Sequence, residues 1–341
     1  MRKKIKAETP SLWERVTKQI SWAFYSLKVK IAQKMPASKK KKSARLGQKR
    51  LKDGIFVYLM LLLPLVQFSI FYIGVNFNSI LMTFQRFDNG VYRFDFSYNF
   101  KLLWNEFILQ PVFGVVIKNS LVSFAVVQLM SPLILFATYF IYKKFVGYRF
   151  FKIMLFLPTI ISAVITVTVY KKVCEIAIPK LWELMFGINI RGLLSNPETR
   201  FGAVMFFYLW LSFGSLMLMY LGAMNGISDS ISEAAKLDGA TSIQEFVYVV
   251  FPMIYPTFST LFYTSVATIF TNQINLYSLW GAEANSSLWT FGYYMYREVT
   301  NAGQADYPRL AALGVLMTLV AAPLTFFFKW LLARLGPRVD R

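Results

Sequence analysis

The chain has 341 residues, of which 56% are hydrophobic and 18% aromatic, and it carries 37 Lys and Arg against 17 Asp and Glu. This composition excludes an ordinary soluble domain, because the apolar residues form long runs while the basic residues crowd the first 52 positions. With Cys174 as the single cysteine and no histidine, the chain cannot form an intramolecular disulfide and lacks the commonest metal ligand and general base. We therefore expect a membrane protein without catalytic or metal-binding residues.

Residues 1–52 form a basic leader that holds 17 Lys and Arg. The first long apolar stretch begins only near residue 55, which is too far along the chain for a secretory signal. Apolar residues recur at helical spacing between Leu12 and Leu27, a pattern that predicts an amphipathic helix on the inner leaflet. Attraction to anionic lipids and orientation of the chain are the favoured roles, with regulation or partner binding as the alternative.

The rest of the chain predicts an all-α membrane protein with six transmembrane helices. Such a helix needs about 20 mainly apolar residues to cross the hydrocarbon layer. These spans make up a predicted transmembrane domain at 53–335, which a short cytoplasmic tail follows at 336–341. Six windows meet the requirement: Ile55 to Val75, Val116 to Tyr142, Phe151 to Tyr170, Phe201 to Met224, Met253 to Asn275 and Leu310 to Leu332.

The distribution of basic residues predicts the orientation, because short loops rich in Lys and Arg stay in the cytoplasm. An arrangement with both termini inside places the leader, the loop around Lys143, Lys144 and Arg149, and the C-terminal tail on that side. The opposite loops mix acidic and basic residues nearly evenly. We expect a multi-pass protein of a bacterial cell membrane.

The predicted cytoplasmic loop between the fourth and fifth spans, at 228–252, is acidic and departs from this charge rule. Ser230 with Glu233, and Ser242 with Glu245, match capping-box spacing, and Gly239 can end the first helix. The pattern predicts two short helices joined by a tight turn. Because a helix of two turns is unstable alone in water, we expect it to dock on its own bundle or on a basic rim of a partner.

The loop contains Glu233, Ala234 and Ala235, then Asp238, Gly239 and Ala240, and then Phe246, Pro252 and Pro256. This series resembles the EAA loop of ABC importer permeases, the inner-membrane components of binding-protein-dependent transport systems, and is more similar to the carbohydrate branch of that family. Positions Leu62 to Pro64, Asn119 and Trp210 also resemble the family, and YYMYR at 293–297 resembles oligosaccharide and polysaccharide permeases. The resemblance implies that the loop couples the spans to a cytoplasmic ATPase. The residues that carry this expectation are Glu233, Ala234, Ala235, Asp238, Gly239 and Ala240.

No G-x-x-x-x-G-K-[ST] phosphate loop occurs, so we expect ATP and Mg²⁺ to be used by a separate ATPase and no cofactor to be bound by this chain. Six spans make half of a pathway, and the resemblance therefore implies a second permease subunit, identical or related. The other expected partners are an ATPase dimer, an extracellular solute-binding lipoprotein, a carbohydrate and membrane lipids. No nucleic acid partner is expected.

Candidate sugar contacts are chosen by chemistry and depth. Sugars bind aromatic faces and amide side chains, which both donate and accept hydrogen bonds. For Trp289, Tyr293 and Tyr294 an interfacial aromatic belt is favoured over sugar contact. The candidates lie in the fourth span and the outer half of the fifth: Tyr208, Trp210, Ser212, Ser215, Asn272, Gln273, Asn275 and Tyr277.

Other classes fit the sequence less well. A gradient-driven secondary carrier would place acidic residues or histidine inside its spans, and these spans lack them. A membrane enzyme would need a nucleophile, base or metal set that the chain does not offer. Among importers, the alternative is a permease for a polyol phosphate or a peptide, although basic residues do not cluster at mid-depth.

Overall fold

The computed structural model describes residues 54–337, and its contacts divide the chain into two units between Phe77 and Asn78. The predicted leader, and the predicted tail from residue 338 on, lie outside the described residues. The first apolar segment is one helical run, Gly54–Thr83, that includes the π-helical stretch η1 (Phe68–Gly74) and then α3 (Val75–Thr83). At 30 residues, the helix is long enough to cross a bilayer.

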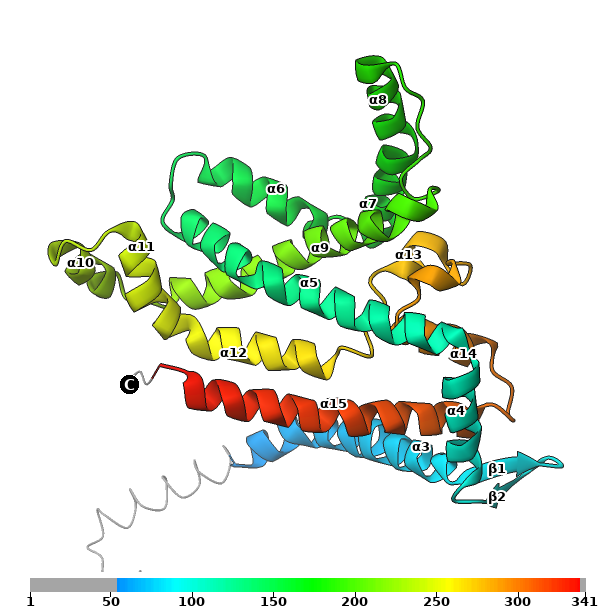
Figure 1. Cartoon of the computed structure of the whole chain (residues 1–341). Helices are drawn as coiled ribbons and strands as arrows, with labels where there is room; N and C mark the ends of the chain where they lie inside the picture. The colour runs from blue at the N-terminus through cyan, green and yellow to red at the C-terminus, as the bar shows by residue number, and fades with distance from the viewer. Residues whose placement is uncertain (1–53, 338–341) are drawn as a thin grey trace, which may run out of the picture. The chain divides into compact units, whose positions relative to one another are not determined.

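Four long helices form the frame of the second unit (Figure 1). They are α5 (Pro111–Tyr142), α9 (Pro197–Asn225), α12 (Phe251–Ala267) and α15 (Tyr307–Leu335). Helix α5 packs most extensively on α9, and α12 on α15. By length and hydropathy, the described residues contain five helices able to cross a membrane, or six if a bent pair counts as one. This confirms the prediction of a helical membrane protein.

A small hairpin lies in the first loop of this unit and was not predicted. Strand β1 (Gln85–Asp88) pairs antiparallel with β2 (Val91–Phe94), and α4 (Tyr98–Leu109) follows. The turn residues Asn89 and Gly90 have φ of +48° and +81°. Asn-Gly favours this mirror-image turn, whose twist matches that of the paired strands. Figure 1 shows the hairpin beside α4, at what we call the hairpin end of the unit.

The third span, predicted from Phe151 to Tyr170, is not a single straight helix in the structure. The chain bends by 110° between Ile160 and Ala163, because Ile161 and Ser162 have extended backbone angles, with ψ of 146° and 134°. Helical structure then continues well beyond Tyr170, the predicted end. The pieces are α6 (Tyr148–Ile160), α7 (Ala163–Lys172), the π-helical η2 (Val173–Ala177) and α8 (Ile178–Phe186).

The predicted fifth span ends earlier than expected. Helix α12 stops at Ala267, and the chain then turns, with positive φ at Ile274 and Asn275. Asn272, which we predicted inside the span, therefore lies in a turn. Three short elements fill the connection to α15: α13 (Leu276–Trp280), the 3₁₀ helix η4 (Ser286–Leu288) and α14 (Phe291–Asn301).

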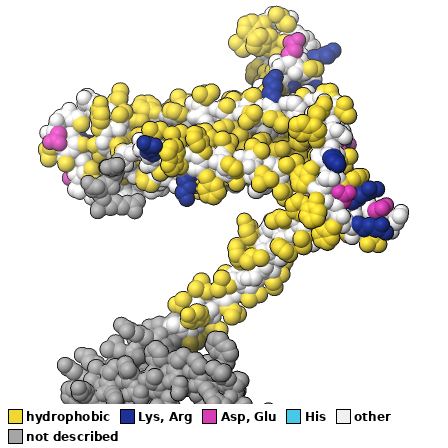
Figure 2. Space-filling model, turned by 60° about the horizontal axis from the view of Figure 1, so that its bottom comes forward, with side chains coloured by type: hydrophobic (Ala, Val, Ile, Leu, Met, Phe, Trp, Pro, Cys, Tyr) yellow, Lys and Arg dark blue, Asp and Glu magenta, His cyan; other side chains and the backbone are white. Residues whose placement is uncertain are grey.

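Buried apolar residues form two clusters, one toward each end of the frame. The larger cluster joins the first halves of α5 and α9 to α13 and α14, with Phe113, Phe207 and Tyr293 at its centre. The smaller joins the second halves of α5 and α9 to the start of α12, around Tyr139 and Tyr220. Figure 2 shows hydrophobic side chains over most of the visible long-helix surface, with many charges near the hairpin end, as expected of helices in lipid.

Candidate functional site

The loop at 228–252 has the predicted arrangement of helix, turn and helix. Helix α10 (Asp229–Leu237) ends before Gly239, whose φ of +79° is one that glycine adopts without the strain of a side chain. Helix α11 (Ser242–Glu245) follows and continues through the π-helical η3 (Phe246–Val250) into α12. Figure 1 shows α10 and α11 together at the end opposite the hairpin, which we call the loop end.

The two predicted capping boxes are wrong. Ser230 and Glu233 lie inside α10, whose N-cap residue Ser228 makes no cap bond and instead pairs its hydroxyl with Ser230 at 2.8 Å. The box that forms begins one residue before Ser242. Thr241 accepts from the N–H of Gln244, and the Gln244 side chain accepts from the N–H of Thr241 at 2.8 Å. The pair Thr241 and Gln244 and the pair Ser242 and Glu245 both match the capping-box spacing, and the first pair forms the box in the structure.

The exposed face of α10 combines acidic and apolar side chains. Glu233, Ala234 and Asp238 are exposed, and Leu237 is 89% exposed. Ala235 is buried at 9% exposure and faces the rest of the unit. The large apolar side chain of Leu237 therefore lies in the open next to the acidic side chains of Glu233 and Asp238.

Glu245, the fourth acid of the loop, has an internal role that the sequence did not predict. It is 3% exposed and pairs with Lys143, directly after the last residue of α5. Ser232 on α10 donates to the same carboxylate at 2.6 Å, and the hydroxyl of Tyr139 donates to it at 3.2 Å. We call these four residues the Lys143 cluster. Only their proximity in the fold reveals it, because Lys143 and Glu245 are 102 positions apart.

Among the predicted substrate residues, the structure brings together Tyr208, Ser212 and Asn272. The amide of Asn272 donates to the hydroxyl of Tyr208, and Ser212, one turn further along α9, interacts with that hydroxyl as well. The Asn272 side-chain oxygen also accepts from the N–H of Ile274 at 2.8 Å, which fixes the turn after α12. Gly292 permits this turn to lie against α14, since a Cβ there would be 2.4 Å from a backbone oxygen of Thr271.

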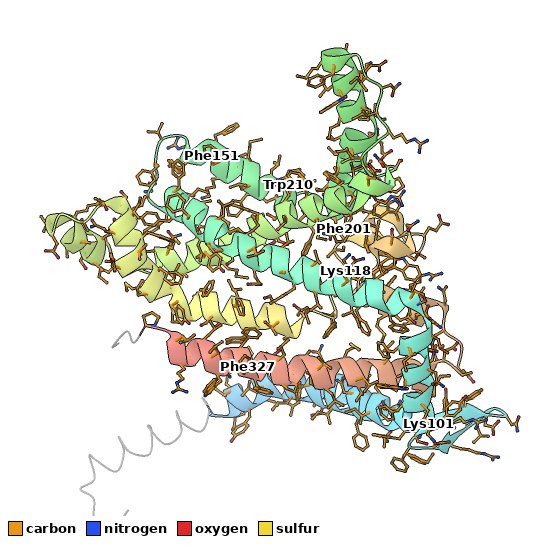
Figure 3. The ribbon with its side chains drawn as sticks, in the orientation of Figure 1. Lys101, Lys118, Phe151, Phe201, Trp210 and Phe327 are labelled. Carbon is orange, nitrogen blue, oxygen red and sulfur yellow. The ribbon has the colours of Figure 1, made fainter. Side chains whose placement is uncertain are left out.

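The remaining candidates are separate from this group. Trp210 packs on the larger apolar cluster from midway along α9 (Figure 3). The hydroxyl of Ser215 donates to the backbone oxygen of Leu211 at 3.2 Å within the helix. Tyr277 packs edge-on against Tyr296, with ring centres 4.7 Å apart. Gln273 and Asn275 lie half-buried in the turn before α13.

Asn119 and Ser120 hold the segment 285–291 against α5. The amide of Asn119 donates to the backbone oxygens of Ser287 and Trp289 at 2.9 and 3.0 Å. The hydroxyl of Ser120 accepts from the N–H of Phe291 at 2.8 Å. Both side chains are buried, at 5% and 0% exposure, so these bonds replace those that water would make.

The predicted aromatic belt at Trp289, Tyr293 and Tyr294 is wrong. The three side chains are 8%, 0% and 4% exposed and belong to the larger apolar cluster. The indole of Trp289 donates to the backbone oxygen of Ala284 at 2.7 Å, and Tyr293 donates to that of Gly281 at 2.8 Å. Their polar atoms are thus satisfied within the protein rather than at a lipid interface.

Two cavities differ strongly in size. The cavity beside Tyr208 and Asn272 has a volume of about 30 Å³, enough for a water molecule but not for a sugar ring. An open cavity of about 610 Å³ lies at the hairpin end, between α4, α14 and α15. Arg309 in its wall pairs with Glu106 and Glu298, and burial raises the pKa of Tyr294 beside them, so this hydroxyl stays protonated.

Long apolar helices, a broken span and a loop of short helices between two of the spans define a class: the polytopic α-helical membrane proteins. The family model for the binding-protein-dependent transport system inner membrane component matches residues 112–341. The chain belongs to this family.

Curated relatives are identical to this chain at about a quarter of the aligned positions. The multiple sugar-binding transport system permease protein MsmF of Streptococcus mutans is 24% identical over 75% of this chain and 88% of its own length. The lactose transport system permease protein LacF of Rhizobium radiobacter is 28% identical, with 76% and 87% covered. The arabinooligosaccharides transport system permease protein AraP of Halalkalibacterium halodurans is also 28% identical, with 82% and 88% covered.

A solved structure has the same fold. A chain of a bacterial ABC transporter involved in the import of the acidic polysaccharide alginate superposes with a TM-score of 0.67 at 21% identity, covering 86% of this chain and 100% of that one. A second structure of a bacterial alginate transporter, in complex with an alginate pentasaccharide-bound periplasmic protein, gives a TM-score of 0.66.

Proposed function

We propose that this chain is a permease subunit of an ATP-driven importer that takes up a carbohydrate, in particular an oligosaccharide. An extracellular solute-binding protein would deliver the sugar, and a second permease subunit would complete the pathway. Family membership and relatives named for lactose, arabinooligosaccharides and multiple sugars support this proposal. In it, both termini and the loop at 228–252 lie in the cytoplasm.

The observation that carries the coupling role is the exposed face of α10. Its acidic side chains Glu233 and Asp238 stand beside the exposed Leu237, which suits a groove with a basic rim and an apolar floor. Ala234 leaves room for close approach, and the turn at Gly239 fixes where the helix ends. ATP and Mg²⁺ would be bound by the partner ATPase, whose closure would push on this helix.

The small cavity beside Tyr208 and Asn272 bears on how sugar would be bound. At about 30 Å³ it cannot admit a sugar ring, so substrate contact at these residues requires movement or a surface completed by the second permease. Asn272 and Tyr208 offer an amide and a phenol in one place, which is the chemistry that sugar hydroxyls need. Among the predicted substrate residues, Asn272 and Tyr208 are therefore the ones that we propose to contact the sugar.

The substitution Glu233→Lys tests the coupling role. It reverses the charge on the exposed face of α10, so we expect uptake per ATP hydrolysed by the reconstituted importer to fall by at least about fivefold. Membrane insertion should be unchanged, because the side chain of Glu233 is exposed on the surface of α10.

The matched control is Glu183→Lys, the same substitution on the exposed helix α8 near the hairpin end, and it should retain normal uptake. Normal uptake by the Glu233→Lys protein would refute the coupling role.

Co-purification in mild detergent, followed by mass spectrometry, identifies the partners. An ATPase, a second permease and a solute-binding protein are expected, and the last can be screened for glycan ligands.

A further inference from the structure

The Lys143 cluster joins helices that are distant in the sequence. The ammonium of Lys143 donates to the Glu245 carboxylate on α11 and, at 2.6 Å, to the hydroxyl of Ser232 on α10. The hydroxyl of Ser232 in turn donates a hydrogen bond to the same Glu245 carboxylate at 2.6 Å. One lysine beside the end of α5 is thus bonded to both short helices of the loop.

This arrangement is protected from water. The side chains of Lys143 and Glu245 are 13% and 4% exposed. In such surroundings a charge that loses its partner is strongly penalised, whereas a satisfied pair holds a fixed geometry. Helix α11 therefore cannot shift away from the end of α5 without separating buried charges, and α10 cannot shift away without breaking both hydrogen bonds of Ser232. The favourable response is for the two short helices and the end of α5 to move together.

Chain connectivity does not supply this link. The loop is joined covalently to α9 and α12, whereas Ser232 lies 89 positions from Lys143. Without the cluster, α5 would respond to α10 only indirectly, through its packing on α9 and α12 and the hydrogen bonds of Ser131 to Tyr220 and of Gln128 to Ser265. Residues of α5 and α12 do pack together in the smaller apolar cluster, but those contacts can slide more easily than a charged hydrogen-bond network.

The other half of α5 holds the segment next to the candidate substrate residues. Asn119 and Ser120 bind 285–291, as described above, and the hydroxyl of Thr290 in that segment donates to the backbone oxygen of Asn272 at 2.7 Å. Asn272 in turn bonds to Tyr208. Helix α5 is thus bonded to α10 through Lys143 at one end and to the segment 285–291 through Asn119 and Ser120 at the other. That segment is bonded to Asn272.

Helix α5 is continuous from Pro111 to Tyr142 although Pro132 lies within it. A proline removes one backbone hydrogen bond and can bend a helix. Here α9 packs along α5 on both sides of that point, and the buried Ser131 pairs with Tyr220 of α9 at 3.4 Å. This support lets the helix carry displacement past the proline.

We propose that Lys143 is a positioning residue of the importer, which makes α5 follow the movement of α10 and carries that movement to the segment 285–291 beside Asn272. The inference rests on the proposed function, because it assumes that α10 is the helix the ATPase moves. It adds a route through a helix that is not adjacent to the loop in sequence.

The test uses the complete importer in proteoliposomes with the variants Lys143→Met and Glu245→Gln, which remove one charge each at similar side-chain size. The ratio of sugar taken up to ATP hydrolysed should fall at least about fivefold, while the amount of ATPase that co-purifies stays unchanged. The double variant Lys143→Glu with Glu245→Lys restores the pair in reverse and should recover most of the ratio.

A single charge removal could prevent folding, so Ser232→Ala provides a second measurement. It keeps the ion pair but removes the bridge to α10, and it should also lower the ratio. The matched control is Lys144→Met, which alters the neighbouring exposed lysine and should leave the ratio unchanged.

Two outcomes would overturn the inference. One is an unaltered ratio in all three single variants of the cluster. The other is a loss of ATPase binding that parallels the loss of uptake, because the cluster would then only hold the loop in its folded form. Failure of the proposed function looks different: no ATPase would co-purify even with the unaltered chain.

Discussion

At the scale of single residues, Arg309 shows how one side chain can organise the hairpin end. Its guanidinium binds both oxygens of Glu106 on α4, at 3.2 and 3.0 Å, and Glu298 on α14 at 2.9 Å. The fork of donors in arginine suits such two-sided pairing. Because Glu106 lies 203 positions from Arg309, no local pattern in the sequence could reveal the contact.

Replacing this arginine leaves two carboxylates facing each other without a cation. We expect Arg309→Gln to lower the free energy of unfolding by about 2 kcal/mol, the typical loss for hydrogen bonds to charged groups. Thermal unfolding of the purified protein in detergent measures the change. The control is Arg334→Gln, since Arg334 is exposed and lies over the ring of Trp330. Equal unfolding temperatures for the two variants would contradict this role of Arg309.

At the scale of elements, the sequence predicts helices better than their ends and bends. Apolar runs locate the long helices because a span must bury about 20 side chains in lipid. The 110° bend after Ile160 escapes this reasoning, since the hydropathy of the run continues through Ile161 and beyond. The end of α12 escapes it as well, because the helix stops at Ala267 although the apolar Ile269 and Phe270 still follow.

Close approach of α6 and α9 can be tested at Gly214. A Cβ at this position would lie 2.5 Å from the backbone oxygen of Leu155, so Gly214→Ala must push the two helices apart. We expect a loss of stability of about 1–3 kcal/mol, as for overpacked cores, measured by thermal unfolding in detergent.

Gly202 on the same helix gives the matched control. A Cβ there meets nothing within 4 Å, so Gly202→Ala should be neutral or stabilise the protein by up to about 1 kcal/mol, because alanine favours the helix. If Gly214→Ala were equally harmless, the helices would not be held as closely as the structure shows.

At the scale of the whole molecule, local and distant interactions differ in how far the sequence predicts them. The loop at 228–252 is contiguous in the sequence, so its pattern predicts both of its short helices and the turn at Gly239. The Lys143 cluster and the contacts of Asn119 join residues that only the fold brings together. The pairing of Asn272 with Tyr208 lies between these cases: the sequence selects both by chemistry, and the structure places them in contact.

The predicted orientation can be tested with introduced cysteines, because the natural Cys174 is 1% exposed and should not react. Gln304→Cys lies in an exposed stretch at the hairpin end, and Arg149→Cys near the start of α6. With both termini in the cytoplasm, a membrane-impermeant maleimide should label Gln304→Cys in intact cells and Arg149→Cys only after permeabilisation. The reverse pattern would mean that the protein is inserted the other way round.

The length of α5 gives small movements a large effect. The 24 positions from Asn119 to Lys143 correspond to a lever of about 36 Å at a rise of 1.5 Å per residue. Tilting this lever by about 5° moves its far tip by about 3 Å, roughly the length of one hydrogen bond. A tilt of α5 that leaves the packing around Lys143 intact would thus be large enough to break the hydrogen bonds of Asn119 to Ser287 and Trp289. Because these bonds are either formed or broken, a small continuous tilt would produce distinct states at this end of the helix.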